Sequence, residues 1–354
     1  MANFRNLADQ TLELAPNLNI FTGNNAQGKT NLLESVYLCC LGKSPRTDRD
    51  RELINRDESR AKVSVDFVSR AGQKQVSVTL AEKKSAAING IPNAKIGEIL
   101  GHLNCVYFSP DEISVITRSP QERRRFLDVD LCQTDKTYYH SLLRFNRILS
   151  QRNNLLKKAK NSADIADILS VWDVQLALEG SRLVQKRGDF CALLAPKARE
   201  IHRLLTKTEN LELEYVSGVS GKTREEMQEV YQKKLAQNLE RDFSQKFTTF
   251  GCQRDDIKFA VDGTDIRAFG SQGQQRTAAL SLKLAELELF FSLTGEYPVL
   301  LLDDVLSELD RGRQRALISF NPGVQIILTA TRVDAALIKN LDYKKFTVKN
   351  GAAT

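Results

Sequence analysis

Hydrophobic and polar positions repeat with a strand-like period in the first third of the chain. Residues 18–21 form a short apolar run that predicts a buried strand, and residues 104–108 form another. Between them, residues 60–92 alternate apolar and polar side chains and contain the hairpin signal Asn89-Gly90, which predicts an antiparallel meander. A shorter alternation over residues 11–14 predicts a further strand near the start.

A helical period replaces this pattern from Pro120 to about residue 205. Apolar residues recur there every three or four positions in two stripes, separated by a polar break at residues 161–164, which predicts an antiparallel helical hairpin. The pattern leaves open whether this hairpin projects as an arm or folds back as a compact subdomain. Strand alternation returns at residues 211–215 and 257–261, on either side of a charged helical stretch over 224–247. We expect three consecutive parts, 1–115, a helical insertion over 116–206, and 207–354.

The first predicted strand leads into a glycine-rich loop and then a helical pattern that ends near Gly42. The loop reads Gly23-Asn24-Asn25-Ala26-Gln27-Gly28-Lys29-Thr30 and fits G-x-x-x-x-G-K-[ST], whose backbone N–H groups cradle phosphates at a helix N-terminus. Lys29 is expected to reach the β- and γ-phosphates, and the Thr30 hydroxyl to hold Mg²⁺. Because strand, loop and helix follow in the required order, we interpret this stretch as a site for ATP and Mg²⁺ rather than a chance turn.

Three stretches in the last hundred residues extend the predicted site. Residues 298–304 form an apolar run that ends in two carboxylates, where Asp303 is expected to hold the metal and Asp304 to act as general base. Residues 271–276 form a small polar turn that opens a helix, whose N-terminus can bind an anion. Ser307 and Asp310 follow the carboxylates, and residues 325–331 predict another buried strand whose polar tip can reach a γ-phosphate.

Composition narrows the partners without identifying them. The chain has 354 residues, a formal net charge of +7 and a pI of about 9.0, which suits a polyanion. The six cysteines show no C-x-x-C pair, which indicates free thiols in a reducing compartment, and no apolar run is long enough to cross a membrane. For phosphate contacts with DNA the candidates are Arg46, Arg123, Arg124, Arg144, Arg147, Lys157 and Lys158, with Arg152 and Lys160 in the same basic stretch. For any one of them, a solvated charged face is the alternative, and Arg125 is an alternative internal ion-pair partner.

The order of these motifs resembles that in the ABC-type ATPase heads of SMC-like proteins. The residues within the motifs are still more similar to those of the RecF family. The similar segments run through the whole chain: Phe4-Arg5-Asn6, residues 23–30, 119–128, 254–256, 271–276 and 301–310. The resemblance implies an α/β fold: an ABC-type P-loop ATPase head, with a mixed sheet and an antiparallel β subdomain, and an inserted α-helical arm domain.

The resemblance also implies how such a head works. ATP is expected between two subunits: Arg5 and residues 23–30 of one bind it, and Ser271, Gln272, Gly273 and Gln274 of the other cap it. Lys29 and Asp304 are the implied catalytic residues, Thr30 and Asp303 the metal ligands, Ser307 and Asp310 the D-loop, and Thr331 the switch position. The implied protein is an ATP-dependent homodimer and weak DNA-stimulated ATPase on double-stranded DNA and single/double-strand junctions, acting with RecR and RecO to load RecA at gaps. It is expected in the cytoplasm on the nucleoid, away from membranes.

Other readings and several departures accompany this resemblance. An SMC-like chromosome-organising head is the main alternative, and a transporter ATPase subunit or a small-molecule kinase explains fewer of the motifs. Most family members begin with a strand ahead of the segment that matches Asn3-Phe4-Arg5, and this sequence does not include it. Family members usually carry Pro-His where Cys252-Gln253 stand here. Asp304 is one methylene shorter than the usual glutamate, which predicts slow hydrolysis. Either Ser109 or Asp111 is a candidate for the position of the metal-contacting glutamine.

Overall fold

The fold was analysed in a computed structural model that describes residues 1–93, 95–113, 115–159, 163–320 and 323–354. The described residues divide into two compact units. Unit 1 comprises Met1–Ser114, Lys197–Asn210 and Ser271–Thr354, and unit 2 comprises Val115–Pro196 and Leu211–Gly270. No helix among these residues is long and apolar enough to pass through a lipid bilayer.

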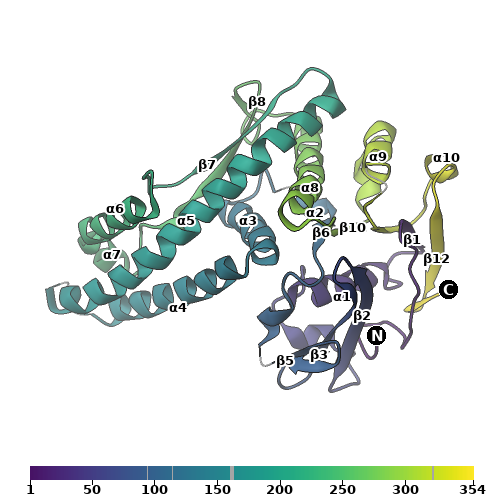
Figure 1. Cartoon of the computed structure of the whole chain (residues 1–354), viewed down its shortest axis with the longest axis horizontal. Helices are drawn as coiled ribbons and strands as arrows, with labels where there is room; N and C mark the ends of the chain where they lie inside the picture. The colour runs from purple at the N-terminus through teal and green to yellow at the C-terminus, as the bar shows by residue number, and fades with distance from the viewer. Residues whose placement is uncertain (94, 114, 160–162, 321–322) are drawn as a thin grey trace. The chain divides into compact units, whose positions relative to one another are not determined.

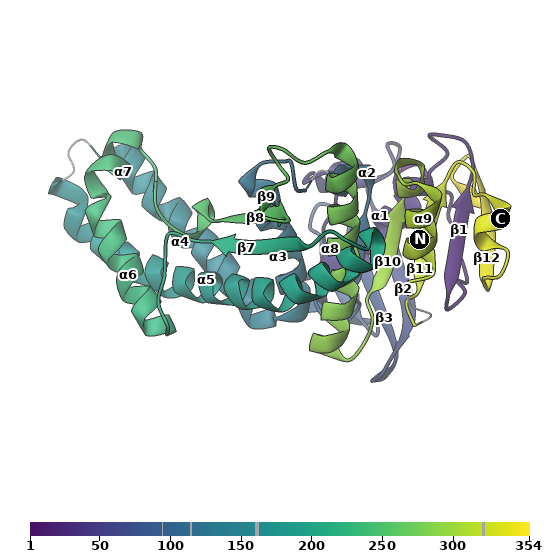
Figure 2. The ribbon, with the colours of Figure 1, turned by 90° about the horizontal axis from the view of Figure 1, so that it is seen from above.

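A mainly parallel sheet forms the centre of unit 1 (Figure 2). Its order is β13-β12-β1-β11-β10-β6, and only β13, at one edge, runs antiparallel to its neighbour among the described strands. Every residue of β1 and β11 is buried, which agrees with the mostly apolar sequences of these two strands. The strands are β1 (Leu18–Thr22), β6 (Cys105–Phe108), β10 (Val299–Asp303), β11 (Ile326–Ala330), β12 (Tyr343–Lys349) and β13 (Ala352–Ala353).

The predicted meander forms a separate antiparallel sheet in unit 1, in the order β2-β3-β4-β5 (Figure 1). Helix α1 (Lys29–Leu41) contacts both this sheet and the parallel one, and the Cys39 thiol donates to the Val63 carbonyl. The helix is therefore buried on several sides, as its run of apolar residues requires. The strands are β2 (Ala61–Ser69), β3 (Gly72–Leu80), β4 (Ser85–Ile88) and β5 (Ile91–Asn93).

Further helices of unit 1 pack around α8 (Gln272–Thr294), which contacts β6, α2 (Pro110–Ile113) and α9 (Arg311–Ile318). Helix α5 (Ala163–Thr206) begins in unit 2, but its last turns, from Lys197 on, belong to unit 1. They meet α8, because His202 Nδ1 lies 3.0 Å from the Ser281 hydroxyl. Helix α10 (Ala335–Ile338) contacts α9. Short 3-10 helices occupy Asp50–Leu53, Ile96–Ile99 and Val305–Glu308.

Unit 2 contains the predicted helical hairpin, formed by α4 and α5 (Figure 1). Arg144 and Arg152 of α4 pair with Glu179 and Asp173 of α5, so the two helices run antiparallel. Leu156 and Leu169 are fully buried where α7 packs against the pair. The elements are α3 (Pro120–Thr134), α4 (Lys136–Lys158), α5 (Ala163–Thr206), β7 (Leu211–Val216), α6 (Arg224–Gln237), α7 (Leu239–Gln245), β8 (Asp256–Val261) and β9 (Thr264–Asp265), with a 3-10 turn at Cys252–Arg254.

The structure differs from the sequence-based expectations in three places. Residues 11–14 form no strand, because their backbone does not join a sheet ladder. The helical stretch that starts at Pro120 is divided at Asp135, whose side chain caps α4. Residues 211–270 were expected in the same part as 271–354, but they pack in unit 2, since strands and buried ion pairs bind them to the preceding helices. The expected polar break lies partly outside the described residues, at 160–162.

Candidate nucleotide-binding site

The glycine-rich loop connects β1 to α1 in unit 1, as predicted. Gly28 adopts φ 107°, and a Cβ there would lie 2.8 Å from the Leu7 side chain. A Cβ on Gly23 would overlap the carbonyl oxygen of Val348. Both positions therefore require glycine for steric reasons, and the loop ends at the free N–H groups of α1. Between the glycines, Ala26 also adopts a positive φ of 63°.

Lys29 is the first residue of α1 and is 7% exposed. Its ammonium donates to the carbonyls of Gly23 and Asn24, at 2.8 and 2.9 Å. These bonds hold the positive charge inside the loop, next to the helix N-terminus. An anion in the loop meets both the ammonium and the partial positive charge of the helix.

The carboxylate of Asp303 connects four elements of unit 1. Its Oδ1 accepts from the hydroxyls of Thr30 and Thr329, both at 2.8 Å, and its Oδ2 accepts from the Tyr107 hydroxyl at 2.9 Å. Thr30 lies in the first turn of α1, while Tyr107 and Thr329 lie on the strands that flank β10. The tertiary structure therefore brings the loop and the carboxylate strand together, although 273 positions separate them.

Sequence reasoning missed the roles of Tyr107 and Thr329. Thr329 is fully buried, and the register places it directly opposite Asp303. A hydroxyl within an otherwise apolar strand was the available signal, but strand order was needed to interpret it. Of the two candidates for the position of the metal-contacting glutamine, Ser109 is buried directly after β6, whereas Asp111 is exposed.

The residues present fit a magnesium ion. The Thr30 hydroxyl and the Asp303 carboxylate are oxygen donors, which Mg²⁺ prefers, and they lie within one hydrogen bond of each other. An ion held there would also take oxygens from a triphosphate and from water. The assignment of both residues as metal ligands stays a prediction.

Asp304 has an unusual backbone conformation, with φ 51° and ψ 20°. Aspartate enters this left-handed region more readily than most residues, because its short side chain causes little crowding. The Asp304 amide lies 3.1 Å from both the carbonyl and the hydroxyl oxygen of Thr329, which fixes the turn. Burial raises the pKa of the half-buried Asp304 carboxyl; Lys29 opposes this rise, and the charges of Asp303 and Glu308 add to it.

The predicted signature caps helix α8. The Ser271 hydroxyl accepts from the Gln274 amide at 3.2 Å, and the Gln274 side chain accepts from the Ser271 amide at 3.0 Å, forming a capping box. Ser271, Gln272 and Gly273 are exposed. Among the described residues, a Cβ added to Gly273 would meet only the Ser271 hydroxyl, at 3.8 Å. This helix end is therefore accessible within unit 1.

The remaining predicted ATP-site residues have local partners or stand exposed. Ser307 donates to the Asp304 carbonyl at 2.8 Å, and Asp310 caps α9. Thr331 is exposed just after β11. Arg5, which the resemblance implies binds ATP, instead makes a two-bond ion pair with the buried Glu34 of α1, at 2.8 and 2.9 Å. Its third nitrogen donates to the Glu52 carbonyl, so this geometry gives Arg5 a structural role.

Several predicted DNA contacts prove to be internal. Arg123 is 1% exposed and pairs with Asp256 through two bonds, so its assignment to DNA is corrected. Arg152 is likewise buried between Asp173 and Asp242. Arg124 donates to the Asp255 carbonyl, and Arg144 pairs with Glu179 while staying about half exposed. Burial favours these pairs because an isolated guanidinium in the core is costly.

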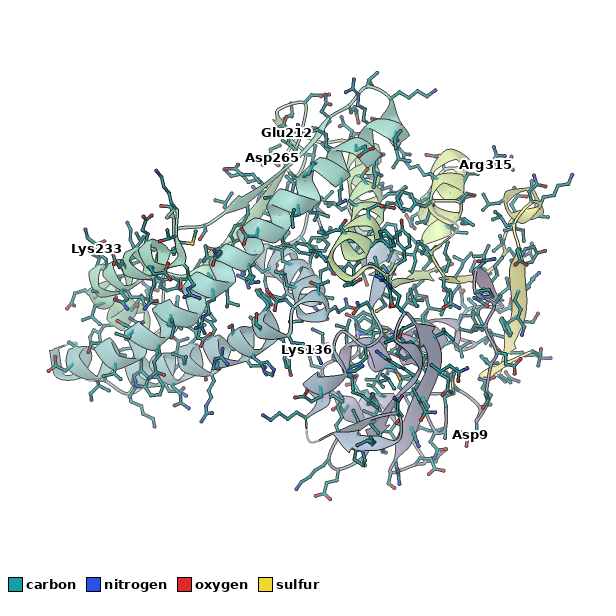
Figure 3. The ribbon with its side chains drawn as sticks, in the orientation of Figure 1. Asp9, Lys136, Glu212, Lys233, Asp265 and Arg315 are labelled. Atoms are coloured by element: carbon teal, nitrogen blue, oxygen red, sulfur yellow. The ribbon has the colours of Figure 1, made fainter. Side chains whose placement is uncertain are left out.

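The other basic candidates lie on the surface. Arg147, Lys157 and Lys158 of α4 are exposed, and Arg46 in unit 1 is exposed while donating to Asn31. Figure 3 labels two further exposed lysines of unit 2, Lys136 and Lys233, that sequence reasoning did not single out. Lys160 lies outside the described residues.

Comparisons with known proteins identify the family of this chain. The AAA domain family matches residues 1–291. A curated relative from Clostridium kluyveri, the DNA replication and repair protein RecF, is 41% identical over 99% of this chain and 97% of its own length. The solved structure of the recombination mediator RecF with ATP, from the RecFOR pathway, is 35% identical with a TM-score of 0.90, covering 99% of this chain and 95% of that one.

The similarity to a more distant structure shows only that the fold is shared. The SMC head domain of Pyrococcus furiosus is 16% identical with a TM-score of 0.56, and covers 99% of this chain and 93% of that one. The expected α/β ABC-type ATPase head is thereby confirmed. The near-complete coverage and 41% identity also decide between the alternatives. The chain belongs to the RecF family of DNA replication and repair proteins.

Proposed function

We propose that this chain binds Mg²⁺-ATP in the loop of residues 23–30 and uses it to form a homodimer on DNA. The observation that carries the proposal is the Asp303 carboxylate, which joins Thr30, Thr329 and Tyr107 at the mouth of the loop. If Asp303 served only to stabilise the fold, its position beside a phosphate-binding loop that carries Lys29 would have no explanation. The description of a relative solved with ATP supports the same ligand.

Each residue of the site has a distinct proposed task. Lys29 exchanges its bonds to the Gly23 and Asn24 carbonyls for bonds to phosphate oxygens. Thr30 and Asp303 would hold Mg²⁺, which would neutralise charge on the phosphates. Asp304 accepts a proton from the attacking water. Its short side chain and constrained backbone hold that water less closely than a glutamate does, so hydrolysis is slow. In this proposal, DNA binding increases the rate of hydrolysis.

The dimer forms when the exposed end of α8 meets the nucleotide of a second copy. The hydroxyl and N–H groups of Ser271 and Gly273 then donate hydrogen bonds to the γ-phosphate. Hydrolysis removes this phosphate, and the two copies separate. The accessibility of Ser271, Gln272 and Gly273 supports this role. In this scheme, Ser307, Asp310 and Thr331 lie at the interface near the nucleotide.

The ATP-bound dimer binds double-stranded DNA and single/double-strand junctions, and acts with RecR and RecO to help load RecA at gaps. The net charge of +7 supports a polyanionic partner, and the names of the relatives support replication and repair. Exposed cations such as Arg147, Lys157 and Lys158 contact phosphates without reading sequence. These tasks belong in the cytoplasm, at the nucleoid.

Light scattering of the wild type, Lys29→Ala and Gly273→Gln, with and without ATP, tests the proposal. We expect dimers only from the wild type with ATP. Lys29→Ala loses nucleotide affinity, whereas Gly273→Gln still binds a fluorescent ATP analogue as a monomer, because its added side chain has room in one chain but blocks the second. A Gly273→Gln protein that dimerises normally would remove the α8 contact from the scheme. A wild type without ATP affinity would remove the whole scheme.

A further inference from the structure

Two turns of unit 1 have the same sequence and backbone but very different surroundings. Asn89-Gly90 joins β4 to β5, with φ values of 50° and 78°. Asn350-Gly351 joins β12 to β13, with φ values of 50° and 79°. Gly90 is exposed, and apart from its two chain neighbours no atom of the described residues lies within 4 Å of its Cβ position. Gly351 is buried, and a Cβ there would overlap the carbonyl oxygen of Asn6.

The buried turn is bonded directly to the nucleotide loop. The Gly351 amide donates to the Gln27 carbonyl at 3.0 Å, and the Asn350 amide donates to the Gln27 side chain at 2.7 Å. The same hairpin also approaches the start of the loop, where Gly23 faces the Val348 carbonyl. The terminal hairpin therefore lies against both ends of the loop.

The N-terminal segment, on which Figure 3 labels Asp9, closes the arrangement from another side. The Gly351 carbonyl accepts from the Ala8 amide at 3.0 Å and from the Gln10 side chain at 2.9 Å. The Gln10 side chain in turn accepts from the Ala353 amide at 2.9 Å. At Gly28, a Cβ would contact Asn6 and Leu7 of the N-terminal segment and Gly351 of the hairpin, so two segments far apart in sequence meet behind the loop.

We propose that Gly351 and its turn are positioning elements for nucleotide binding, because they hold Gln27 and the loop backbone in the conformation that accepts phosphates. A phosphate loop binds through N–H groups whose directions depend on the backbone, so fixing that backbone before the ligand arrives lowers the cost of binding. Gly351 touches no nucleotide in this scheme and acts through Gln27. The inference rests on the proposed ATP site.

The matched turns provide the experiment. Gly351→Ala and Gly90→Ala impose the same backbone strain, but only the first displaces the segments behind the loop. We expect Gly351→Ala to weaken affinity for a fluorescent ATP analogue at least tenfold, and to raise the half-saturating ATP concentration for hydrolysis more than it lowers the saturated rate. Gly90→Ala should stay within twofold of the wild type. Equal affinities of the two variants would overturn the proposal.

A milder pair covers the case in which Gly351→Ala fails to fold. Gln10→Ala removes two bonds to the turn without straining the backbone, whereas Gln75→Ala removes a bond to Asp66 in the antiparallel sheet. We expect a threefold or larger loss of ATP affinity for Gln10→Ala only. In the wild type, ATP should also slow amide exchange of residues 343–354, and unchanged exchange would count against the proposal. A wild type that binds no ATP would instead refute the proposed function.

Discussion

Charged side chains serve opposite purposes in the two units. At the nucleotide site of unit 1, Lys29 donates to backbone carbonyls, and Asp303 accepts from neutral hydroxyls. These hydrogen-bond partners are uncharged, so they do not neutralise either side chain. In unit 2, Arg123 and Arg152 are buried and form ion pairs, Arg123 with Asp256 and Arg152 with Asp173 and Asp242. Neutral partners leave charge available for a ligand, whereas ionic partners use it to join elements of the fold.

The same difference explains which basic residues remain candidates for DNA. Arg147 and Arg152 lie five positions apart on α4, yet one is exposed and the other is buried between two acids from α5 and α7. Charge density along the sequence is equal at both positions. Only the packing of the helix decides which side chain can reach a phosphate.

The largest expected effect comes from breaking a buried pair of unit 2. Arg152→Met leaves Asp173 and Asp242 without their shared cation, so we expect a loss of about 3–5 kcal/mol in the unfolding free energy of unit 2. Urea unfolding followed by circular dichroism measures it. Arg147→Met on the same helix is the control and should change stability by less than about 0.5 kcal/mol. Similar losses for both variants would contradict the contrast between the units.

A change at the nucleotide site should affect the reaction more than the fold. Thr329→Val removes the hydroxyl that contacts both Asp303 and the Asp304 amide. We expect steady-state ATP hydrolysis to fall by about 10- to 100-fold, as for other residues that orient a metal ligand. Thr347→Val, on the exposed face of β12, is the matched control. Hydrolysis by Thr329→Val at the control's rate would show that this hydroxyl does not orient the carboxylates.

The smallest expected effect concerns acid stability. Burial works to raise the pKa of Asp256, but the bonds from Arg123 and the Ile257 amide and the charge of Arg267 hold it below its ordinary value. A lowered pKa in the folded state contributes stability above the unfolded pKa of about 3.9, and this contribution is lost as the pH falls through the folded value. Asp256→Asn should therefore flatten the decline in unfolding midpoint between neutral and acidic pH.

The acid-stability comparison needs a second carboxylate variant. Glu212→Gln, at an exposed position of β7, should leave the pH profile like that of the wild type. An Asp256→Asn profile as steep as that of Glu212→Gln would mean that the Arg123 pair adds no pH-dependent stability. Measuring the unfolding midpoint of all three proteins at the same ionic strength keeps screening constant.

Local sequence patterns determined most of the secondary structure and the motifs of this protein. The loop of residues 23–30, the strand before Asp303 and the cap of α8 each depend on a few neighbouring residues, whose backbone preferences and hydrophobic periods act over short distances. For that reason the α/β head, the meander and the helical hairpin were all predictable. Residues 11–14 show the limit, because an alternating pattern forms a strand only when a neighbouring strand is available.

Tertiary structure alone decided how these pieces are used. The register that sets Thr329 opposite Asp303, the meeting of Gly351 with Gln27, and the burial of Arg123 against Asp256 all join residues from distant parts of the chain. Periodicity carries no information about which distant partner a side chain will meet. The sequence therefore determined the phosphate loop and its chemistry, whereas packing determined which charges stay available to a ligand and which stabilise the fold.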